Sequence, residues 1–131
     1  MRLINSVMLS LFLISTPLIA EDEEKVAPTI NYYEIKPSLV ANLASGGKYI
    51  RTDIQLMTKD ESFMEKLALH DPAIRHTLLL LLSEQDGKTI KQPEGKDNLR
   101  KQALASVGDL MKDVSGKEGL DALYFTTFFI Q

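Results

Sequence analysis

Histidines, hydroxyls and carboxylates are the side chains of this sequence that could take part in a reaction, because the chain contains no cysteine. His70 and His76 are six positions apart, a spacing that does not place two side chains on one face of a helix, and no HExxH motif is present. Thr77 follows His76 directly, so in a helix the two side chains point in different directions and cannot work as nucleophile and base. The sequence therefore predicts neither a metal site nor an acyl-transfer site.

The other candidate motifs have structural explanations. Asp60 and Glu61 are neighbouring carboxylates at the start of a predicted helix, where the helix macrodipole favours them. Three Gly-Lys pairs, at 47–48, 95–96 and 116–117, lack the longer glycine-spaced turn and the following Ser or Thr of a phosphate-binding loop. We therefore predict no catalytic residue and no cofactor, and a protein that is not an enzyme.

The first part of the chain has the composition of an export signal. Residues 3–20 carry no charge, and their firmly apolar part, 7–14, has the length of the apolar region of a secretory signal. Four consecutive acids follow directly, where a retained anchor is expected to be followed by basic residues. We predict cleavage between Ala20 and Glu21. A retained anchor at 3–20 and a buried soluble helix are the alternatives, and cleavage or anchoring would place the rest of the chain outside the cytoplasm.

Length and charge limit the remaining possibilities. The chain has 131 residues, and the part after residue 20 is long enough for one domain with a core that needs no disulfides. The whole chain carries 15 basic and 18 acidic residues, a net charge of −3, whereas nucleic-acid binding requires a basic face. We therefore expect no nucleic-acid partner.

Two strands are predicted after an acidic, flexible lead-in at 21–30. Apolar and aromatic residues indicate β-structure at 31–43 and at 48–57, with Pro37 at a kink or bulge of the first strand. Gly46 and Gly47 lie between these segments and are typical of a hairpin turn. The first half of the domain is therefore predicted to be an antiparallel pair.

Helical spacing follows the hairpin. Asp60 is predicted to cap a first helix, and Asp71, with Pro72 at the first helical position, is predicted to cap a second one. The five consecutive leucines at 78–82 occupy every side of this second helix, so we expect it to be buried around most of its circumference. Residues 88–91 are predicted to form a brief edge strand.

A long helix at 93–114 and a final strand at 120–130 complete the domain. Gly108 costs the long helix about 1 kcal/mol relative to Ala, which suggests close packing against a neighbour. The final strand is apolar on both faces, with Phe125 and Phe129 on the same face, so we expect it to lie centrally in the sheet. Strands and helices are segregated along the chain, which predicts an α+β fold with an antiparallel or mixed sheet and about three helices.

Four segments carry a more specific signal when they are taken together. They are KYIRTDIQL (48–56), DPAIRHTLLLLLS (71–83), QPEGKDNLRKQAL (92–104) and LYFTTFFIQ (123–131). In this order and at this spacing they resemble the extracytoplasmic domain of the FliL family of flagellar basal-body-associated proteins.

The resemblance implies a periplasmic FliL-like domain at 31–131 with a fold similar to the stomatin-type (SPFH-like) domain. It also implies a homo- or hetero-oligomeric ring around the stator units of the flagellar motor, close to the membrane, that supports stator engagement and motility. The expected partners are the periplasmic segment of the stator, an anchored FliL protein, or both.

The chain departs from the family pattern at 3–20, because family members usually carry a full transmembrane helix. We therefore expect the periplasm as its location, with the inner membrane, anchored by 3–20, as the alternative. The alternative function is a periplasmic scaffold or a small-ligand-binding module with the same fold, unrelated to the motor. A large enclosed apolar pocket would favour the ligand module, and a flat face with a polar rim would favour assembly.

Overall fold

Three antiparallel strands and four helices make up the part of the chain that the computed structural model describes, residues 27–131. The strands are β1 (Asn31–Asn42), β2 (Tyr49–Thr58) and β3 (Ala122–Ile130), paired in the order β1-β2-β3. The helices are α1 (Glu61–Leu69), α2 (Asp71–Ser83), α3 (Gly87–Lys91) and α4 (Pro93–Ser115). The predicted α+β class with an antiparallel sheet is confirmed.

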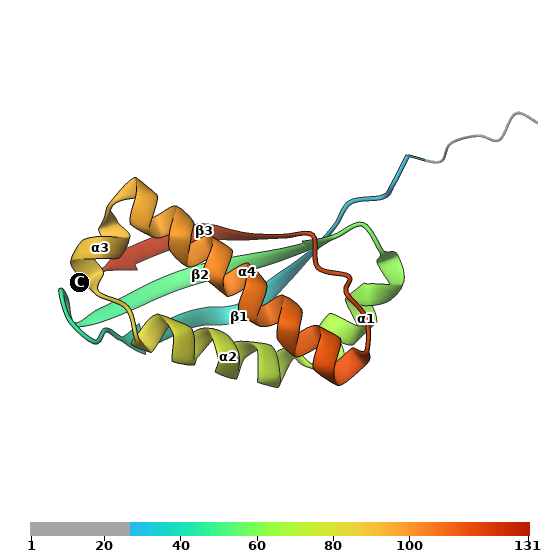
Figure 1. Cartoon of the computed structure of the whole chain (residues 1–131), viewed down its shortest axis with the longest axis horizontal. Coiled ribbons are helices and arrows are strands. Elements are labelled where there is room, and N and C mark those ends of the chain that lie inside the picture. The colour runs from blue at the N-terminus through green and yellow to red at the C-terminus, as the bar shows by residue number, and fades with distance from the viewer. Residues whose placement is uncertain (1–26) are drawn as a thin grey trace, which may run out of the picture.

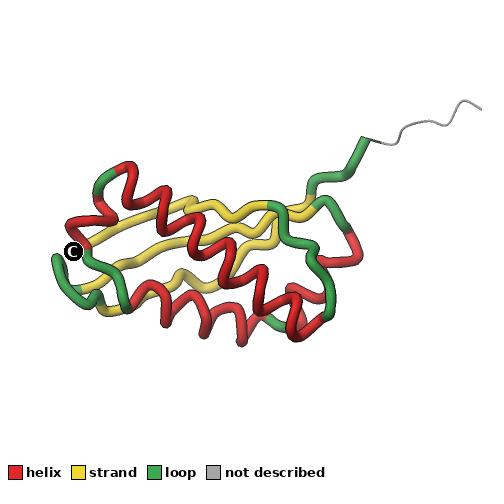
Figure 2. Tube along the Cα trace, in the orientation of Figure 1, coloured by secondary structure: helices red, strands yellow, loops and turns green. Residues whose placement is uncertain are grey.

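All the helices follow β2 in the sequence and precede β3, and α2 and α4 lie over one face of the sheet (Figure 1). Helix α4 runs obliquely across the strands from α3 toward α1, as the tube in Figure 2 shows most clearly. Among residues 27–131, no helix combines the length and the hydropathy that a membrane crossing requires.

The predicted export segment lies outside the described residues. This applies to 3–20, to the cleavage point between Ala20 and Glu21, and to most of the lead-in at 21–30. Residues 27–30 of the lead-in are described, and they are exposed and form neither helix nor strand.

The predicted hairpin is formed by β1 and β2, whose connection is closed by a hydrogen bond from the Leu43 N–H to the Lys48 carbonyl at 3.0 Å. Gly46 in this connection has a φ of 70°, a left-handed conformation that glycine adopts without steric cost. Pairing with β2 is interrupted in β1 between Ile35 and Leu39, so the predicted irregularity at Pro37 is confirmed.

Strand β3 contains one extra residue. Phe125 pairs with Ile54, whereas Thr127 pairs with the preceding residue of β2, Asp53, so Thr126 has no partner position and forms a bulge. Because side chains alternate between the two faces of a strand, one extra residue exchanges the faces of all residues that follow it.

This bulge corrects the predicted faces of β3. Leu123 is fully buried and Phe125 packs against the core, but beyond the bulge Phe128 and Ile130 pack against the core instead of Phe129. The side chain of Phe129 is 53% exposed. The prediction that Phe125 and Phe129 share a face is therefore wrong. The prediction of a central position for β3 is also wrong, because β2 is the central strand.

The helix starts agree with the predictions in part. The Asp60 carboxylate caps α1 by accepting a hydrogen bond from the Ser62 N–H at 3.0 Å, as predicted. Helix α2 begins at Asp71 with His70 as its N-cap, so the prediction of Asp71 as the cap and Pro72 as the first helical residue is wrong. No side chain caps α2, and the Asp71 carboxylate accepts a hydrogen bond from the Tyr33 hydroxyl at 2.9 Å. Burial, together with this bond, raises the pKa of Tyr33 to about 12.

Four of the five leucines at 78–82 contact the core, and Leu79 and Leu81 do so while partly exposed. Leu78 and Leu82 are fully buried, whereas Leu80 is 52% exposed. The prediction of burial around most of the helix is therefore wrong at Leu80. The reason is that α2 lies at the outside of its layer, with β1 and α4 as its main neighbours.

Residues 88–91, predicted as an edge strand, belong to the short helix α3, so this prediction is wrong. The Asp86 carboxylate caps α3 by accepting from the Lys88 N–H at 3.3 Å and from the Thr89 hydroxyl at 2.8 Å. The Asp86 cap, together with the Thr89 hydroxyl three residues later, therefore stabilises a helical turn at these residues.

The two glycines of α4 have different surroundings, and at Gly108 these differ from the prediction. Helix α4 itself is confirmed, but a methyl group at Gly108 would meet no atom within 4 Å, so the predicted close packing at Gly108 is wrong. At Gly95 a methyl group would collide with the backbone carbonyl of Thr89. Gly95 therefore lets the first turn of α4 approach α3 closely.

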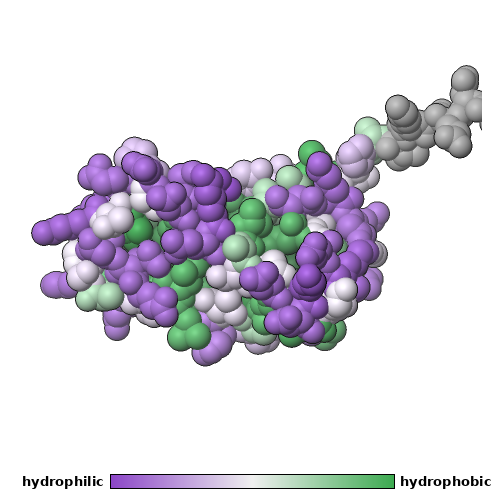
Figure 3. Space-filling view, in the orientation of Figure 1, coloured by the Kyte–Doolittle hydropathy of each residue, from purple (hydrophilic) through white to green (hydrophobic). Residues whose placement is uncertain are grey.

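One hydrophobic core lies between the sheet and the helices. Buried side chains from all three strands and all four helices meet in it: Ile35, Leu39, Ala41, Ile50, Ile54, Leu56, Phe63, Leu67, Ile74, Leu78, Leu82, Ile90, Leu99, Ala103, Val107, Met111 and Leu123. Hydrophilic side chains cover most of the helix side of the molecule, with apolar ones between them (Figure 3).

Candidate interaction surface

The residues with catalytic potential are not assembled into a site. His70 lies at the junction of α1 and α2, and His76 is exposed on α2. Within residues 27–131, no group of three His, Asp or Glu side chains is arranged to hold a metal ion. The candidate functional features of the described part of the chain are therefore surfaces.

The first surface is the face of the sheet opposite to α2 and α4, which we call the open sheet face. Its side chains come from alternate positions of all three strands: Tyr32, Val40, Tyr49, Arg51, Asp53, Tyr124 and Phe129. Tyr32 is 54% exposed and its ring centre lies 6.5 Å from that of Tyr124. Tyr49 and Phe129 form a second tilted pair at 6.4 Å. Grouped exposed aromatic side chains are typical of protein–protein contacts.

Asp53 lies at the centre of the open sheet face. Its carboxylate accepts one hydrogen bond from the Ser38 hydroxyl, in the irregular part of β1, and one from the Thr127 hydroxyl at 2.7 Å, next to the bulge of β3. These two bonds, the first being the stronger influence, lower the pKa of Asp53. The two irregular segments therefore hold a charged carboxylate between the aromatic pairs.

The second surface is an open groove between α4 and the free edge of β3, which we call the edge groove. One part, of about 280 Å³, is lined by Pro93, Lys96, Asp97, Arg100, Tyr124 and Phe125. The other part, of about 380 Å³, is lined by Ile90, Lys91, Lys96, Phe128, Phe129 and Ile130.

Lys96 joins the two parts of the edge groove. Its ammonium lies 4.8 Å from the ring centre of Phe128, a cation–π distance, and Phe128 in turn packs edge-on against Phe125 at 5.1 Å. Neither part of the groove is enclosed, so its geometry fits a macromolecular contact better than the capture of a small ligand.

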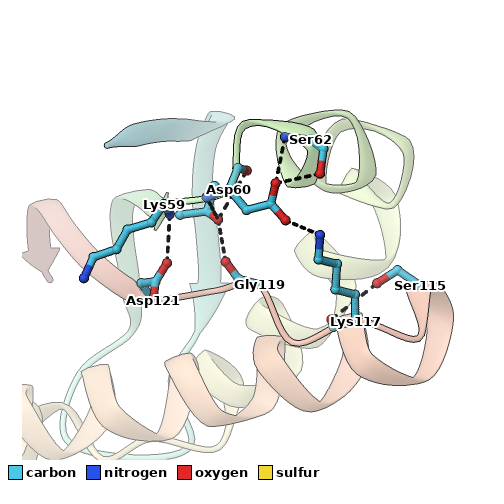
Figure 4. Close-up of polar contacts among 8 residues, drawn as sticks. Lys59, Asp60, Ser62, Ser115, Lys117, Gly119 and Asp121 are labelled. Carbon is cyan, nitrogen blue, oxygen red and sulfur yellow. Dashed lines mark hydrogen bonds and ion pairs between the residues drawn. The ribbon is translucent and has the colours of Figure 1, made fainter. Parts of the chain in front are cut away.

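A polar cluster fixes the start of β3 against the start of α1 (Figure 4). The Lys117 ammonium forms an ion pair with the Asp60 carboxylate, and the Lys59 N–H donates to the Asp121 carboxylate at 2.8 Å. The hydrogen bond from Lys117, followed by that from Ser62, lowers the pKa of Asp60 to about 2. The cluster sets the position from which β3 runs along both surfaces.

Comparison with known protein families identifies the family of this chain. The family model described as "Flagellar basal body-associated protein FliL" matches residues 32–131. The chain belongs to the FliL family. FliL proteins are flagellar accessory components and not a family of enzymes. The prediction from the four sequence segments is confirmed at this level, whereas the likeness to the stomatin-type domain stays a prediction.

Two FliL relatives show how far the similarity extends. The flagellar protein FliL of Aquifex aeolicus (strain VF5) is 26% identical over 101 residues, which cover 76% of this chain and 60% of the relative. The flagellar protein FliL of Escherichia coli (strain K12) is 26% identical over 109 residues, 83% of this chain and 70% of the relative. The chain thus spans about 60% of the length of the Aquifex protein.

The FliL match contains every residue named for the two surfaces. Segments 92–104 and 123–131, which are distant in the sequence, meet at the edge groove, and 48–56 forms most of the central strand. Sequence analysis did not identify the open sheet face as a candidate site. The alternation in β1 and β2 carries a signal for it, but the side of the sheet that the helices cover is decided by tertiary packing.

Proposed function

We propose that this FliL-family protein supports the engagement of stator units by the flagellar motor and thereby torque generation under load. Its partner in this proposal is a motor component close to the membrane, either the periplasmic segment of the stator or an anchored FliL protein in a homo- or hetero-oligomeric ring. Family membership supports an association with the basal body.

The open sheet face is the observation that carries the proposal. It presents two aromatic pairs on a sheet whose opposite side is packed against helices, so the rings are held on a stable support. Such a face can bury apolar area against a partner without first reorganising, which lowers the entropic cost of binding.

A gene deletion with complementation tests this proposal. Deletion is expected to reduce swimming in viscous medium while filaments still assemble, and the wild-type gene is expected to restore it. A Tyr32→Glu/Val40→Glu gene should fail to restore it, because both exposed side chains belong to the open sheet face alone and burying a charge in the contact is costly. Leu69→Glu is the matched control, since Leu69 is an exposed apolar residue of α1 away from both surfaces.

Recovery of binding partners completes the test. The tagged full chain is expected to capture motor components, and the Tyr32→Glu/Val40→Glu chain is expected to capture less. Normal motility of the deletion strain under load, with no motor protein recovered, would contradict the proposal and favour the periplasmic scaffold or ligand-binding alternative.

We further propose that the protein works in the periplasm after cleavage between Ala20 and Glu21, with an inner-membrane form anchored by 3–20 as the alternative. The short apolar part and the acidic residues that follow it support cleavage. Osmotic shock should release a species whose intact mass begins at Glu21. Full-length protein found only in washed membranes would establish the anchored form.

A further inference from the structure

We propose that the edge groove binds the acidic segment 21–24 of a second copy of this chain. The proposal rests on the homo-oligomeric form of the proposed function and gives it a contact, and its test measures self-association and not motility. Three features carry the inference: the charge of the groove, the free edge of β3, and the direction in which the chain leaves β1.

The rim of the edge groove carries an excess of positive charge. Lys91, Lys96 and Arg100 line it, and among residues 27–131 no carboxylate lies within ion-pair distance of Lys91 or Lys96. The one acid of the groove, Asp97, is already paired with Arg100 at 2.9 Å and with Lys101 at 3.0 Å. Residues 21–24, Glu-Asp-Glu-Glu, are the longest acidic run of the sequence and match this rim in charge.

The floor of the groove offers backbone groups to an extended segment. Tyr49 and Gln131 exchange two backbone hydrogen bonds, each 3.1 Å long. Hydrogen-bonded and non-hydrogen-bonded pairs alternate along antiparallel strands, so Phe128 and Ile130 direct their N–H and C=O groups away from β2, toward the groove. An extended peptide can add to such an edge by strand pairing, while its side chains at alternate positions reach the rim. Strand β3 contains no charged residue that would oppose this pairing.

The course of the chain before β1 favours a second copy as the source. Residues 27–30 are exposed and lead away from the domain at the end of the sheet opposite to α3 (Figure 1). Strand β2 separates β1 from β3, and the groove runs toward α3. Residues 27–30 of one copy thus lead away from its own groove. Residues 21–24 remain in the chain whether or not 1–20 are removed.

Complementation between two variants tests the proposal with the full chain, purified in mild detergent. One variant, Glu21→Gln/Asp22→Asn/Glu23→Gln/Glu24→Gln, lacks the acidic segment and keeps the groove. The other, Lys91→Glu/Lys96→Glu, lacks the basic rim and keeps the segment. Sedimentation velocity measures the association of each variant and of their mixture.

The wild-type chain is expected to self-associate with rising concentration, and less at high salt, because screening weakens the charged contact. Each variant alone should associate at least about tenfold more weakly, because each lacks one side of the charge pairing. The mixture should form heterodimers, since one chain supplies an intact groove and the other an intact segment. Heterodimer formation also shows that both variants are folded.

Lys36→Glu/Lys59→Glu is the matched control, because it reverses two charges outside the groove and should associate like the wild type. A mixture that stays monomeric would overturn the proposal. So would a wild-type chain that is monomeric at every concentration, or a segment variant that associates as tightly as the wild type.

Discussion

The Asp53 carboxylate accepts hydrogen bonds from Ser38 and Thr127, so one side chain of the central strand connects the irregular segments of both outer strands. We expect Asp53→Ala to release these segments, because their hydroxyls lose the shared acceptor. Hydrogen exchange should become faster around residues 37–39 and 126–128 and stay unchanged in α4. Gln55→Ala, on the same face of β2, is the control; equal exchange in both variants would show that the connection is unimportant.

Two apolar residues of β3 are expected to differ sharply in their contribution to stability. Leu123→Ala should lower the free energy of unfolding by about 2 to 5 kcal/mol, because Leu123 is fully buried. Phe129→Ala should change it by less than about 0.5 kcal/mol, because the ring is exposed on the open sheet face. Urea denaturation measures both values. A large loss at Phe129 would place that ring in the core and contradict the bulge at Thr126.

Substitution of the two glycines of α4 by alanine is expected to change stability in opposite directions. Gly108→Ala should stabilise the protein by about 0.5 to 1 kcal/mol, because the added methyl group meets no atom within 4 Å and Ala is the better helix former. Gly95→Ala should destabilise it by about 1 to 3 kcal/mol, because the methyl group collides with the Thr89 carbonyl. Thermal unfolding of the two variants gives the sign of each effect. Equal signs would contradict the close approach of α3 and α4.

The ion pair between Asp60 and Lys117 is expected to make stability depend on pH. The folded state lowers the pKa of Asp60 from 3.8 to about 2, so this group stabilises the fold above about pH 3.8 and ceases to do so as the pH falls toward 2. Asp60→Asn should therefore unfold at a lower temperature than the wild type at neutral pH, and the difference should vanish near pH 2. Glu65→Gln, an exposed change in α1, should show no such dependence. A difference that is constant with pH would exclude the ion pair as its cause.

The elements with strong local signals could be predicted from the sequence. The hairpin, the Asp60 cap and α4 each have a turn, a capping residue or a long apolar stripe that specifies them locally. Residues 88–91 were mispredicted because an alternating pattern over four residues is too short to distinguish a strand from a capped helical turn. Leu80 shows the same limit for burial, since five leucines in a row do not reveal which side of α2 faces the core.

The candidate surfaces were less accessible to sequence analysis, because they depend on long-range pairing. The open sheet face exists because the helices cover only one side of the sheet. The edge groove brings together α4 and β3, which are joined by a loop that the Lys117–Asp60 ion pair holds against the start of α1. The bulge at Thr126 has a weak local signal, two threonines within an aromatic strand. Only its register with β2 shows that Phe128 and Phe129 have exchanged faces.

The bulge also has a consequence for evolution. Loss of the single residue Thr126 would make β3 a regular strand and leave the faces unchanged, with Phe128 and Ile130 toward the core and Phe129 outward, because Thr126 occupies no pairing position. A strand that kept Thr126 but paired it regularly with β2 would instead turn Phe129 inward and Phe128 and Ile130 outward. A FliL relative without this extra residue can therefore keep the same core and surface positions at the end of the strand, whereas alternation counted through Thr126 in this chain assigns those positions to the wrong faces.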